Sequence, residues 1–483
     1  MRSALSFLAA AGCLAAPAAA QQGSPQYVRA IAAGYKAGFL CSNIFNGGLT
    51  EAQTEADDLK GTYAELNPLF VELPAQIDRR RRQVRVTYSE TMPPRIAQWR
   101  PALGCTNLPI GSAPEAAGNL PRIVGAEAAD QKELDRRPWP MGDLRATARP
   151  RGDAAALNRA IANSFDRRTY GEGSETTAVL VLQGEKIVAE RYRGDFNMHN
   201  SQRTWSVAKS IAATVIGRAV QQGIVDLHAP VGLAGATIGM AAPGATAKPW
   251  PRVPEWSSPQ DPRGAITTNQ LLRMSSGLNS DFAGNRTDAL YFGGIGIAEQ
   301  AASFPLINPP GTVFRYANND TVLAIRSLQY GLGDSGAALA FPYEHLFWRI
   351  GMTRTAAETD HNGHFIMSSQ VWTTARDLAR LGLLHLRDGV WQGERLLPAG
   401  WNDYVRRRGS AQPARGYGYG AGWWTFPADA GLPDDSFIAQ GNRGQYVVVV
   451  PSRQVVIVRR GFDSTQARFD PAALTRDVLA ALR

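Results

Sequence analysis

The sequence predicts an α+β fold in which one antiparallel β-sheet is flanked by helices and a helical lobe is inserted in the middle of the domain. Two hairpin patterns lie far apart in the chain, one over residues 179–191 and the other over residues 444–461. The segments between them are mostly helical or loop-like. Strands from the two ends of a domain can pair in one sheet, and the intervening helices then cover that sheet, so these patterns favour a layered architecture.

Each hairpin carries its own turn signal. In the first, apolar strands at 179–183 and 186–191 are separated by Gly184-Glu185, the length of a tight two-residue turn. In the second, the strand patterns flank Pro451-Ser452-Arg453. Each segment therefore predicts a pair of neighbouring antiparallel strands.

Helical patterns surround and separate the hairpins. The stretch "LNRAIANSFD" precedes the first hairpin, and "DPAALTRDVLAALR" closes the chain as an amphipathic helix with Pro471 in its first turn. Between the hairpins we expect helices at 206–222, 268–276, 319–330, 342–350 and 373–387. These five helices would cover the sheet and form the inserted helical lobe.

Residues 21–150 look like a small accessory region that precedes the main domain, residues 151–483. Its patterns are a helix at 27–40, a strand in "QVRVTYSE" and a further strand in "PRIAQWRPALGCT", which ends at Cys105. "DRRPWPMGD", at residues 135–143, is typical of a linker.

The first 20 residues have the features of a secretory signal peptide. Arg2 is followed by a short apolar run and by Ala18-Ala19-Ala20 before Gln21, and the run is too short to span a bilayer. Cleavage would leave Cys41 and Cys105, which predict one disulfide in an oxidising compartment, although two buried thiols are the alternative. We therefore expect a periplasmic or secreted protein.

The net charge of +9 does not by itself identify a partner. The arginines are scattered, and the one run, "DRRRRQVRV", lies beside a predicted strand, where a solvated edge explains it. No nucleic-acid motif is present. We expect a small-molecule substrate and no cofactor, and the sequence leaves the oligomeric state open.

The stretch "TWSVAKSIAATVIGRAV" places a serine and a lysine on one face of an apolar helix. Ser206 and Lys209 are three residues apart, and the residues after them are apolar nearly all round, which is typical of a buried helix. Burial of an amine lowers its pKa, and a neutral amine can activate a neighbouring hydroxyl. The alternative is that Ser206 caps the helix and Lys209 extends to solvent.

Two later segments could complete such a site. "GTVFRYANND" contains Tyr316 and Asn318; a tyrosine can relay a proton, and an amide can orient the lysine and a substrate carbonyl. "AQGNRGQYVVVV" has Gly441 and Gly444 just before a strand, where a substrate carbonyl can approach a backbone N–H. An ordinary loop and an ordinary turn are the alternatives.

Two rival chemistries have weaker signals. "GDSG", at residues 333–336, resembles a serine-protease nucleophile loop, but no hydrophobic strand precedes it and the chain has no G-x-S-x-G elbow. His361 and His364 lie in a polar loop that contains Gly363, and no third metal ligand is evident. We therefore predict no metal site.

The order of these motifs resembles the serine β-lactamase and penicillin-binding-protein superfamily, in which S-x-x-K opens the site. Here Y-x-N follows about 110 residues later, and a glycine motif opens a late strand. "LLRMSSGL", "GYGYGAGWW" and residues 372–401 look more specifically like class C β-lactamase-related esterases and 6-aminohexanoate-dimer hydrolases. The resemblance covers about residues 155–483 and leaves the first 150 outside.

This resemblance implies a role for each motif residue. Ser206 would be the acyl-accepting nucleophile, Lys209 its proton acceptor or electrostatic activator, Tyr316 the general acid/base and Asn318 a positioning residue. Backbone N–H groups of Ser206 and Gln445 would form the oxyanion hole.

The third motif departs from the family pattern. The K-T-G lysine is missing, because no lysine follows Lys248, and the matching stretch is Asn442-Arg443-Gly444. Arg443 could hold a substrate carboxylate, but its geometry differs from that of a lysine. Esters, short amides or oligomeric amides therefore fit better than β-lactams. We expect an exported serine hydrolase of this kind; the alternatives are a non-catalytic cell-wall peptide sensor of the same fold, and a D-amino-acid peptidase or weak β-lactamase.

Overall fold

The fold is built around a seven-stranded antiparallel sheet that joins the two ends of the main domain. The structure is a computed structural model that describes residues 24–61, 66–126, 131–231, 256, 258, 260–279 and 291–483. The predicted signal segment lies outside these residues. The sheet order is β12-β13-β14-β15-β16-β5-β6, so β5 from the start of the domain pairs with β16 from its end. The predicted α+β fold is thereby confirmed.

The strands of this sheet include both predicted hairpins. Their bounds are β5 (Thr176–Gln183), β6 (Lys186–Tyr192), β12 (Gly418–Tyr419), β13 (Trp424–Thr425), β14 (Phe437–Gly441), β15 (Gln445–Val450) and β16 (Val455–Gly461). The sequence reading contained no strand for β12, β13 or β14, because the first two have only two residues each.

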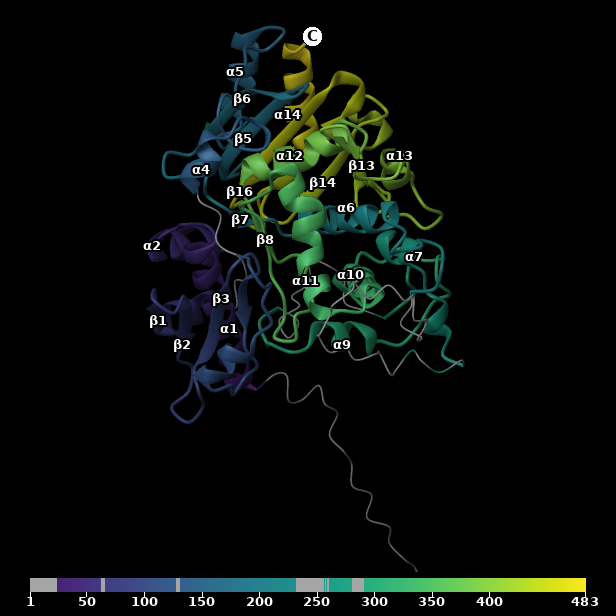
Figure 1. Cartoon of the computed structure of the whole chain (residues 1–483). Helices are drawn as coiled ribbons and strands as arrows, with labels where there is room; N and C mark the ends of the chain where they lie inside the picture. The colour runs from purple at the N-terminus through teal and green to yellow at the C-terminus, as the bar shows by residue number, and fades with distance from the viewer. Residues whose placement is uncertain are drawn as a thin grey trace, which may run out of the picture.

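Helices cover both faces of the sheet (Figure 1). Alternate residues of a strand point to opposite faces, and β5 shows this directly. Val179 and Val181 pack with α5 (Ala154–Asn163) and α14 (Pro471–Ala481), whereas Leu180 and Leu182 belong to the core that contains α6 and α12. Both faces of β5 are therefore buried, which explains its continuous apolar run.

The inserted lobe is mainly helical and lies below the sheet in Figure 1. The α-helices between β7 and β12, which form the lobe or pack next to the sheet, are α6 (Val207–Gln221), α7 (Thr268–Leu272), α9 (Ile297–Ala302), α10 (Asn318–Leu332), α11 (Ser335–Pro342), α12 (Ala375–Leu386) and α13 (Trp401–Arg406). The helix expected at 342–350 is instead a π-helical turn followed by a 3₁₀ turn, and α11 precedes it. Pro342 ends the α-helical pattern there.

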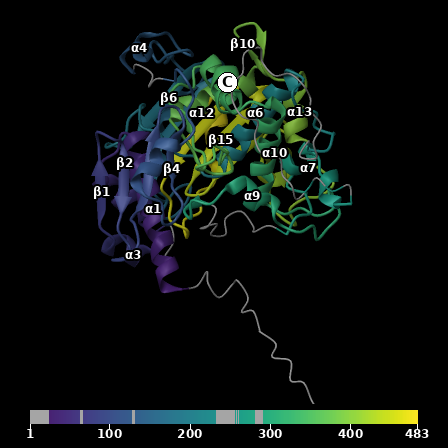
Figure 2. The ribbon, with the colours of Figure 1, turned by 60° about the horizontal axis from the view of Figure 1, so that its bottom comes forward.

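The N-terminal module, residues 24–150, contains a four-stranded antiparallel sheet in the order β1-β2-β3-β4. Its elements are α1 (Pro25–Phe45), α2 (Glu51–Gln53), α3 (Asn67–Glu72), β1 (Ala75–Asp78), β2 (Gln83–Val86), β3 (Arg95–Arg100), β4 (Gly104–Asn107) and α4 (Gln131–Arg136). The strand predicted up to Cys105 is the hairpin β3–β4, because Ala102 and Gly104 adopt positive φ and turn the chain. Figure 2 shows α1 alongside this sheet.

The N-terminal module shares its core with the main domain. Ala33, Phe39 and Leu40 of α1 are buried in the same cluster as Trp205 and Ile211. Ser42 and the Cys105 backbone N–H both donate to Glu358 of the main domain, at 2.6 and 3.0 Å. The module is thus packed against the main domain by apolar and polar contacts.

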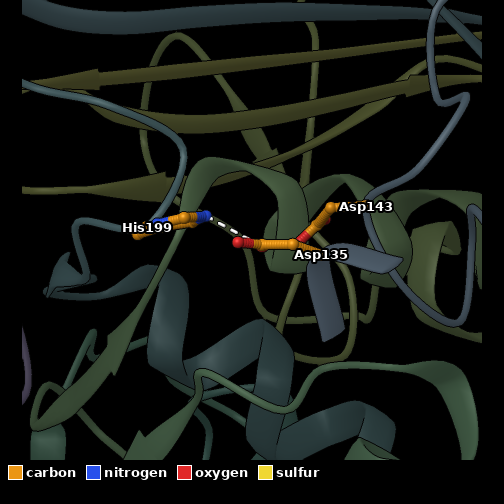
Figure 3. A group of neighbouring side chains, drawn as sticks. All are labelled: Asp135, Asp143 and His199. Atoms are coloured by element: carbon orange, nitrogen blue, oxygen red, sulfur yellow. Dashed lines mark hydrogen bonds and ion pairs between the residues drawn. The ribbon is translucent and has the colours of Figure 1, made fainter. Parts of the chain in front are cut away.

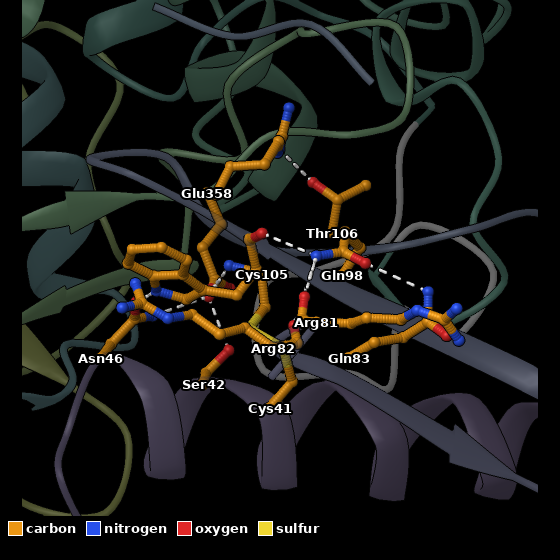
Figure 4. Close-up of a disulfide and its surroundings, with 12 residues drawn as sticks. Cys41, Ser42, Asn46, Arg81, Arg82, Gln83, Gln98, Cys105, Thr106 and Glu358 are labelled. Carbon is orange, nitrogen blue, oxygen red and sulfur yellow. Dashed lines mark hydrogen bonds between the residues drawn. A yellow bond between two sulfur atoms is a disulfide. The ribbon is translucent and has the colours of Figure 1, made fainter. Parts of the chain in front are cut away.

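The structure contains the predicted Cys41–Cys105 disulfide, with the two Cα atoms 6.1 Å apart (Figure 4). It ties α1 to β4 within the N-terminal module. The predicted linker is also anchored, since Trp139 is buried and its ring packs under the guanidinium of Arg380 at 4.6 Å.

Two short sheets complete the fold. One has the order β7-β9-β8 and contains β7 (Gln202–Arg203), β8 (Ala356–Ala357) and β9 (Val371–Thr373). The other is the hairpin of β10 (Val390–Trp391) and β11 (Glu394–Arg395). Among the residues that the structure describes, no helix has the length and apolar character needed to cross a bilayer.

Candidate active site

Ser206 lies at the junction between β7 and α6. It occupies the N-cap position of α6, but its side chain makes no capping hydrogen bond. The residue before it, Trp205, has a φ of 50°, a left-handed conformation that costs a non-glycine residue about 1–3 kcal/mol. The hydroxyl of Ser206 is therefore not used by the helix, and the turn that presents it is strained.

Lys209 lies one turn further along α6 and is buried, with 1% of its surface exposed. Its Nζ is 3.2 Å from Ser206 Oγ, 2.8 Å from Asn318 Oδ1 and 2.8 Å from the carbonyl oxygen of Ser368. The lysine does not extend to solvent, and it forms no ion pair with a carboxylate of the described residues.

This environment favours the neutral amine. Burial, and next the positive charge of Arg203, lower the pKa of Lys209 to about 7. A neutral amine has two N–H groups and one lone pair. If Asn318 and Ser368 accept the two hydrogens, the lone pair is left for the Ser206 hydroxyl. The arrangement can remove a proton from Ser206.

Tyr316 supplies a phenol that lies close to both Ser206 and Lys209. The ring lies 4.9 Å from Lys209 Nζ, and the hydroxyl forms hydrogen bonds with Ser206 and Trp424. Burial raises the pKa of Tyr316 to about 12, against the smaller lowering effect of these two hydrogen bonds. The phenol is therefore protonated at neutral pH and can donate a proton.

Gly441 brings the end of β14 next to the serine. A Cβ atom at this position would lie 2.3 Å from the carbonyl oxygen of Thr204 and 3.2 Å from the Ser206 nitrogen. Only glycine allows this approach. On the edge of β14 that faces away from β15, β13 pairs with Phe437 and Ile438 and not with residues 439–441, so that edge has no ladder partner at 439–441 among the described residues.

The remaining residues of the third motif lie further along the hairpin. Asn442 is exposed and follows Gly441 directly. A Cβ on Gly444 would meet Arg459 and Asp463, away from Ser206, and Gln445 pairs with Gly441.

The side chain of Gln445 supports the hairpin from behind. Its amide donates to the Arg443 and Gly461 carbonyls, and its oxygen accepts from Arg460. Of the two glycines in this motif, Gly441 lies next to Ser206 and Gly444 does not.

Arg443 is not directed at the substrate side. Its guanidinium is buried and lies 3.1 Å from the Asp58 carboxylate of the N-terminal module, and it also donates to the backbone oxygens of Asp57 and Lys60. Arg443, the positively charged residue of the third motif, thus links the N-terminal module to the main domain.

Sequence reasoning did not find two of the site's groups. The carbonyl of Ser368 holds Lys209, and Trp424 contacts Tyr316 with ring centroids 5.1 Å apart. No side-chain pattern marks a carbonyl acceptor, so Ser368 had no signal. Trp424 lay in the quoted "GYGYGAGWW", which the resemblance included without a role.

The rival motifs have structural explanations in the described residues. Asp334 of "GDSG" caps α11 by accepting from the Ala337 N–H at 2.7 Å. Asp360 accepts from the backbone N–H groups of Ile297 and His364, both at 2.9 Å, and so fixes its own loop.

Among the described residues, two groups of acids and a histidine lie close enough together to hold an ion: Glu299 with Asp360 and His364, where Glu299 is the third possible ligand that the sequence did not reveal, and Asp135 with Asp143 and His199 (Figure 3). His199 Nε2 is 3.0 Å from Asp135 Oδ1. The charges of the two carboxylates are already compensated, because Arg354 pairs with both and Arg380 pairs with Asp143. Asp135 and Asp143 therefore belong to an ion-pair network with arginines. Because the arginines already neutralise these carboxylates, this second group does not suit a metal cation.

Comparisons of the sequence and the fold with known proteins identify the family of this chain. A 6-aminohexanoate-dimer hydrolase from Paenarthrobacter ureafaciens is 27% identical over 302 residues, 59% of this chain and 72% of that protein. A family VIII carboxylesterase structure has a TM-score of 0.53 at 14% identity, covering 69% of this chain and 98% of the other. A penicillin-binding protein homologue from Caulobacter crescentus has a TM-score of 0.50 at 17% identity, with 69% and 98% covered. The family described as Beta-lactamase matches residues 161–477, and the chain belongs to this family.

Proposed function

We propose that this protein is an exported serine hydrolase that cleaves ester or amide bonds through an acyl-enzyme on Ser206. The observation that carries the proposal is the buried amine of Lys209, 3.2 Å from the Ser206 hydroxyl and in contact with uncharged acceptors. A buried amine with a pKa near 7 is a suitable general base at neutral pH.

Acylation follows from the positions of three side chains. Ser206 Oγ attacks the substrate carbonyl carbon and its proton passes to the Lys209 lone pair. The tetrahedral intermediate then collapses, the bond to the leaving group breaks, and Tyr316 donates its proton to that group. Lys209 returns the proton to Tyr316, which restores the phenol.

Deacylation uses the same groups in reverse. A water molecule gives its proton to the neutral Lys209 amine as its oxygen attacks the acyl carbon. The bond to Ser206 Oγ breaks and the oxygen regains a proton, which releases the carboxylic acid. Neither step requires a metal ion.

The backbone beside Ser206 can stabilise the oxyanion. We assign one donor to the Ser206 N–H, at the start of α6, where the helix dipole adds a favourable field. We assign the second donor to the N–H of Asn442, because the preceding residue, Gly441, is so close to the serine that a Cβ on it would lie 3.2 Å from the Ser206 nitrogen. Gln445 then supports the hairpin and does not donate.

The substrate class follows from what the third motif lacks. Arg443 is buried against Asp58 and no lysine occurs after Lys248, so this motif provides no cation for a substrate carboxylate. Aromatic rings of Tyr316, Tyr419 and Trp424 form one side of the site. We therefore propose uncharged esters and short or oligomeric amides, in agreement with the name of the 27% identical relative, a 6-aminohexanoate-dimer hydrolase.

Export rests on independent features. Residues 1–20 have the pattern of a signal peptide, and the Cys41–Cys105 disulfide is typical of oxidising compartments. We propose a periplasmic or secreted location. Mass spectrometry of the protein purified from its native host would show an N-terminus near Gln21; a retained Met1 would contradict export by this route.

The test of the chemistry is covalent labelling. A p-nitrophenyl phosphonate should label the purified protein with release of p-nitrophenol, peptide mapping should place the adduct on Ser206, and Ser206→Ala should abolish it. Labelling at another serine would contradict the site, and no labelling would favour a non-catalytic binding protein. A panel of p-nitrophenyl esters, amide dimers, D-amino-acid peptides and nitrocefin then defines the substrate, with nitrocefin expected to be the poorest.

A further inference from the structure

Arg203 is a buried cation that the proposed chemistry does not use. It lies on β7, three residues before Ser206, and has 2% of its surface exposed. Nη2 donates to Ser369 Oγ at 2.7 Å and Nε to the Ser369 carbonyl at 3.3 Å, while Nη1 has no hydrogen-bond partner among the described residues. No carboxylate of the described residues forms an ion pair with it. An unpaired buried charge is costly, so its surroundings must compensate.

Aromatic rings surround this guanidinium. Its carbon lies 3.8 Å from the Trp205 ring centroid, 5.1 Å from Phe39, 5.6 Å from Tyr291 and 5.9 Å from Phe292. Ring faces attract cations, and the attraction is stronger where water is excluded. We call these four rings the aromatic box. Three come from the main domain, and Phe39 comes from α1 of the N-terminal module.

The box is connected directly to the proposed reaction centre. Trp205 is the residue that presents Ser206. Ser369, which binds Arg203, follows Ser368, whose carbonyl accepts from Lys209 at 2.8 Å. The hydroxyl of Ser368 in turn bonds to Tyr291 of the box at 2.8 Å. A movement of Arg203 would therefore disturb both the serine and the lysine acceptor.

We propose that Arg203 is a positioning residue for Ser206 and Lys209, and that the N-terminal module completes the site by closing the aromatic box with Phe39. The inference rests on the proposed function and gives a role to the region that lies outside the family match. Without α1, one wall of the box would be open and water could reach the guanidinium. The module thus takes part in the chemistry without touching the substrate.

The charge of Arg203 also acts on the lysine. It is the second cause, after burial, of the lowered pKa of Lys209. Other titratable groups face this pair: Tyr316 on the substrate side, Tyr291 in the box, and the carboxyls of Asp58 and Glu358, both of which experience the Arg203 charge. Burial raises the pKa of Glu358 to about 7, so its titration must be separated from that of Lys209.

The experiment is the pH dependence of Ser206 labelling by the phosphonate, using the full mature chain. In the wild type the rate should rise through about pH 7. Arg203→Met should move this rise upward by roughly one pH unit, which lowers the rate at pH 7 roughly fivefold. Arg203→Lys keeps the charge and should restore much of the wild-type profile. Phe39→Leu should move the rise in the same direction by a smaller amount.

Three matched variants separate positioning from general damage. Arg218→Met removes a buried arginine from the far end of α6, and Phe70→Leu removes a buried module ring that stacks on Tyr35 but is not part of the box. Glu358→Gln removes the competing titration. All three should leave the midpoint where it is.

An unchanged midpoint in Arg203→Met and Phe39→Leu, with Ser206 still labelled, would overturn the inference and leave the proposed function standing. A midpoint shift in Glu358→Gln as large as that in Arg203→Met would also overturn it. If Arg203→Met does not fold, Phe39→Leu alone decides. Absence of Ser206-dependent labelling in the wild type would instead overturn the proposed function, and this inference with it.

Discussion

Two buried regions of this molecule each contain a basic side chain, but only one of them provides a carboxylate to neutralise it. At the seam between the N-terminal module and the main domain, Arg443 faces the Asp58 carboxylate at 3.1 Å and several backbone carbonyls. In the active site, Lys209 has only a hydroxyl, an amide oxygen and a carbonyl as acceptors. The first cation is compensated, whereas the second is not.

The difference separates a structural role from a chemical one. An ion-paired guanidinium holds two parts of the chain together and stays charged. An amine with neutral acceptors loses its proton near pH 7, and its lone pair then becomes available to Ser206. Burial without a carboxylate partner makes the Lys209 amine reactive. At the seam, the same lack of a partner would leave the buried Arg443 charge uncompensated and would destabilise the packing of the two parts.

The largest expected effect is at Lys209. Lys209→Met should lower kcat by roughly 10²–10⁴-fold, since it removes the base while leaving an apolar side chain of similar length. Lys209→Arg keeps a charge without an available lone pair and should be nearly as inactive. Steady-state kinetics with a p-nitrophenyl ester measures both, and wild-type kcat in either variant would remove the basis of the comparison.

At the seam, stability should change instead of chemistry. Arg443→Met leaves the Asp58 carboxylate buried without its cation and should reduce the free energy of unfolding by about 3–5 kcal/mol. Urea unfolding measures this loss, and adding Asp58→Asn should recover part of it. A variant of unchanged stability that has lost its pH-dependent acylation would show that the two regions do not differ as described.

A smaller effect is expected from the disulfide. Cys41→Ser with Cys105→Ser opens a link between residues 64 apart and should cost about 2–5 kcal/mol of stability. The acylation rate of the folded fraction should be preserved, because the disulfide lies within the N-terminal module and neither sulfur takes part in the proposed reaction. Two free thiols in the purified oxidised protein, by mass spectrometry, would contradict the pairing.

The parts of the fold and site that the sequence predicted are those with short-range signals. Ser206 and Lys209 are three residues apart at the start of an apolar helix, and Tyr316 and Asn318 are two residues apart in one Y-x-N motif. The hairpins β5–β6 and β15–β16 follow from long apolar strands joined by turns. In each case the sequence itself contains the whole pattern.

The parts that sequence reasoning missed depend on long-range contacts. β14 was not predicted as a strand, and the role of Gly441 emerges only from its approach to Thr204 and Ser206. Arg443 could have been a substrate-binding cation until the structure placed it against Asp58, 385 residues away in sequence. The carbonyl of Ser368 carries no side-chain signal at all.

The titration of the Lys209 amine tests the central claim most directly. The chain contains six lysines, so selective ¹³C and ¹⁵N labelling of lysine gives few signals, and Lys209→Arg assigns the one of interest. The account predicts that this signal titrates near pH 7. A Lys209 signal that stays protonated to pH 10 would contradict it.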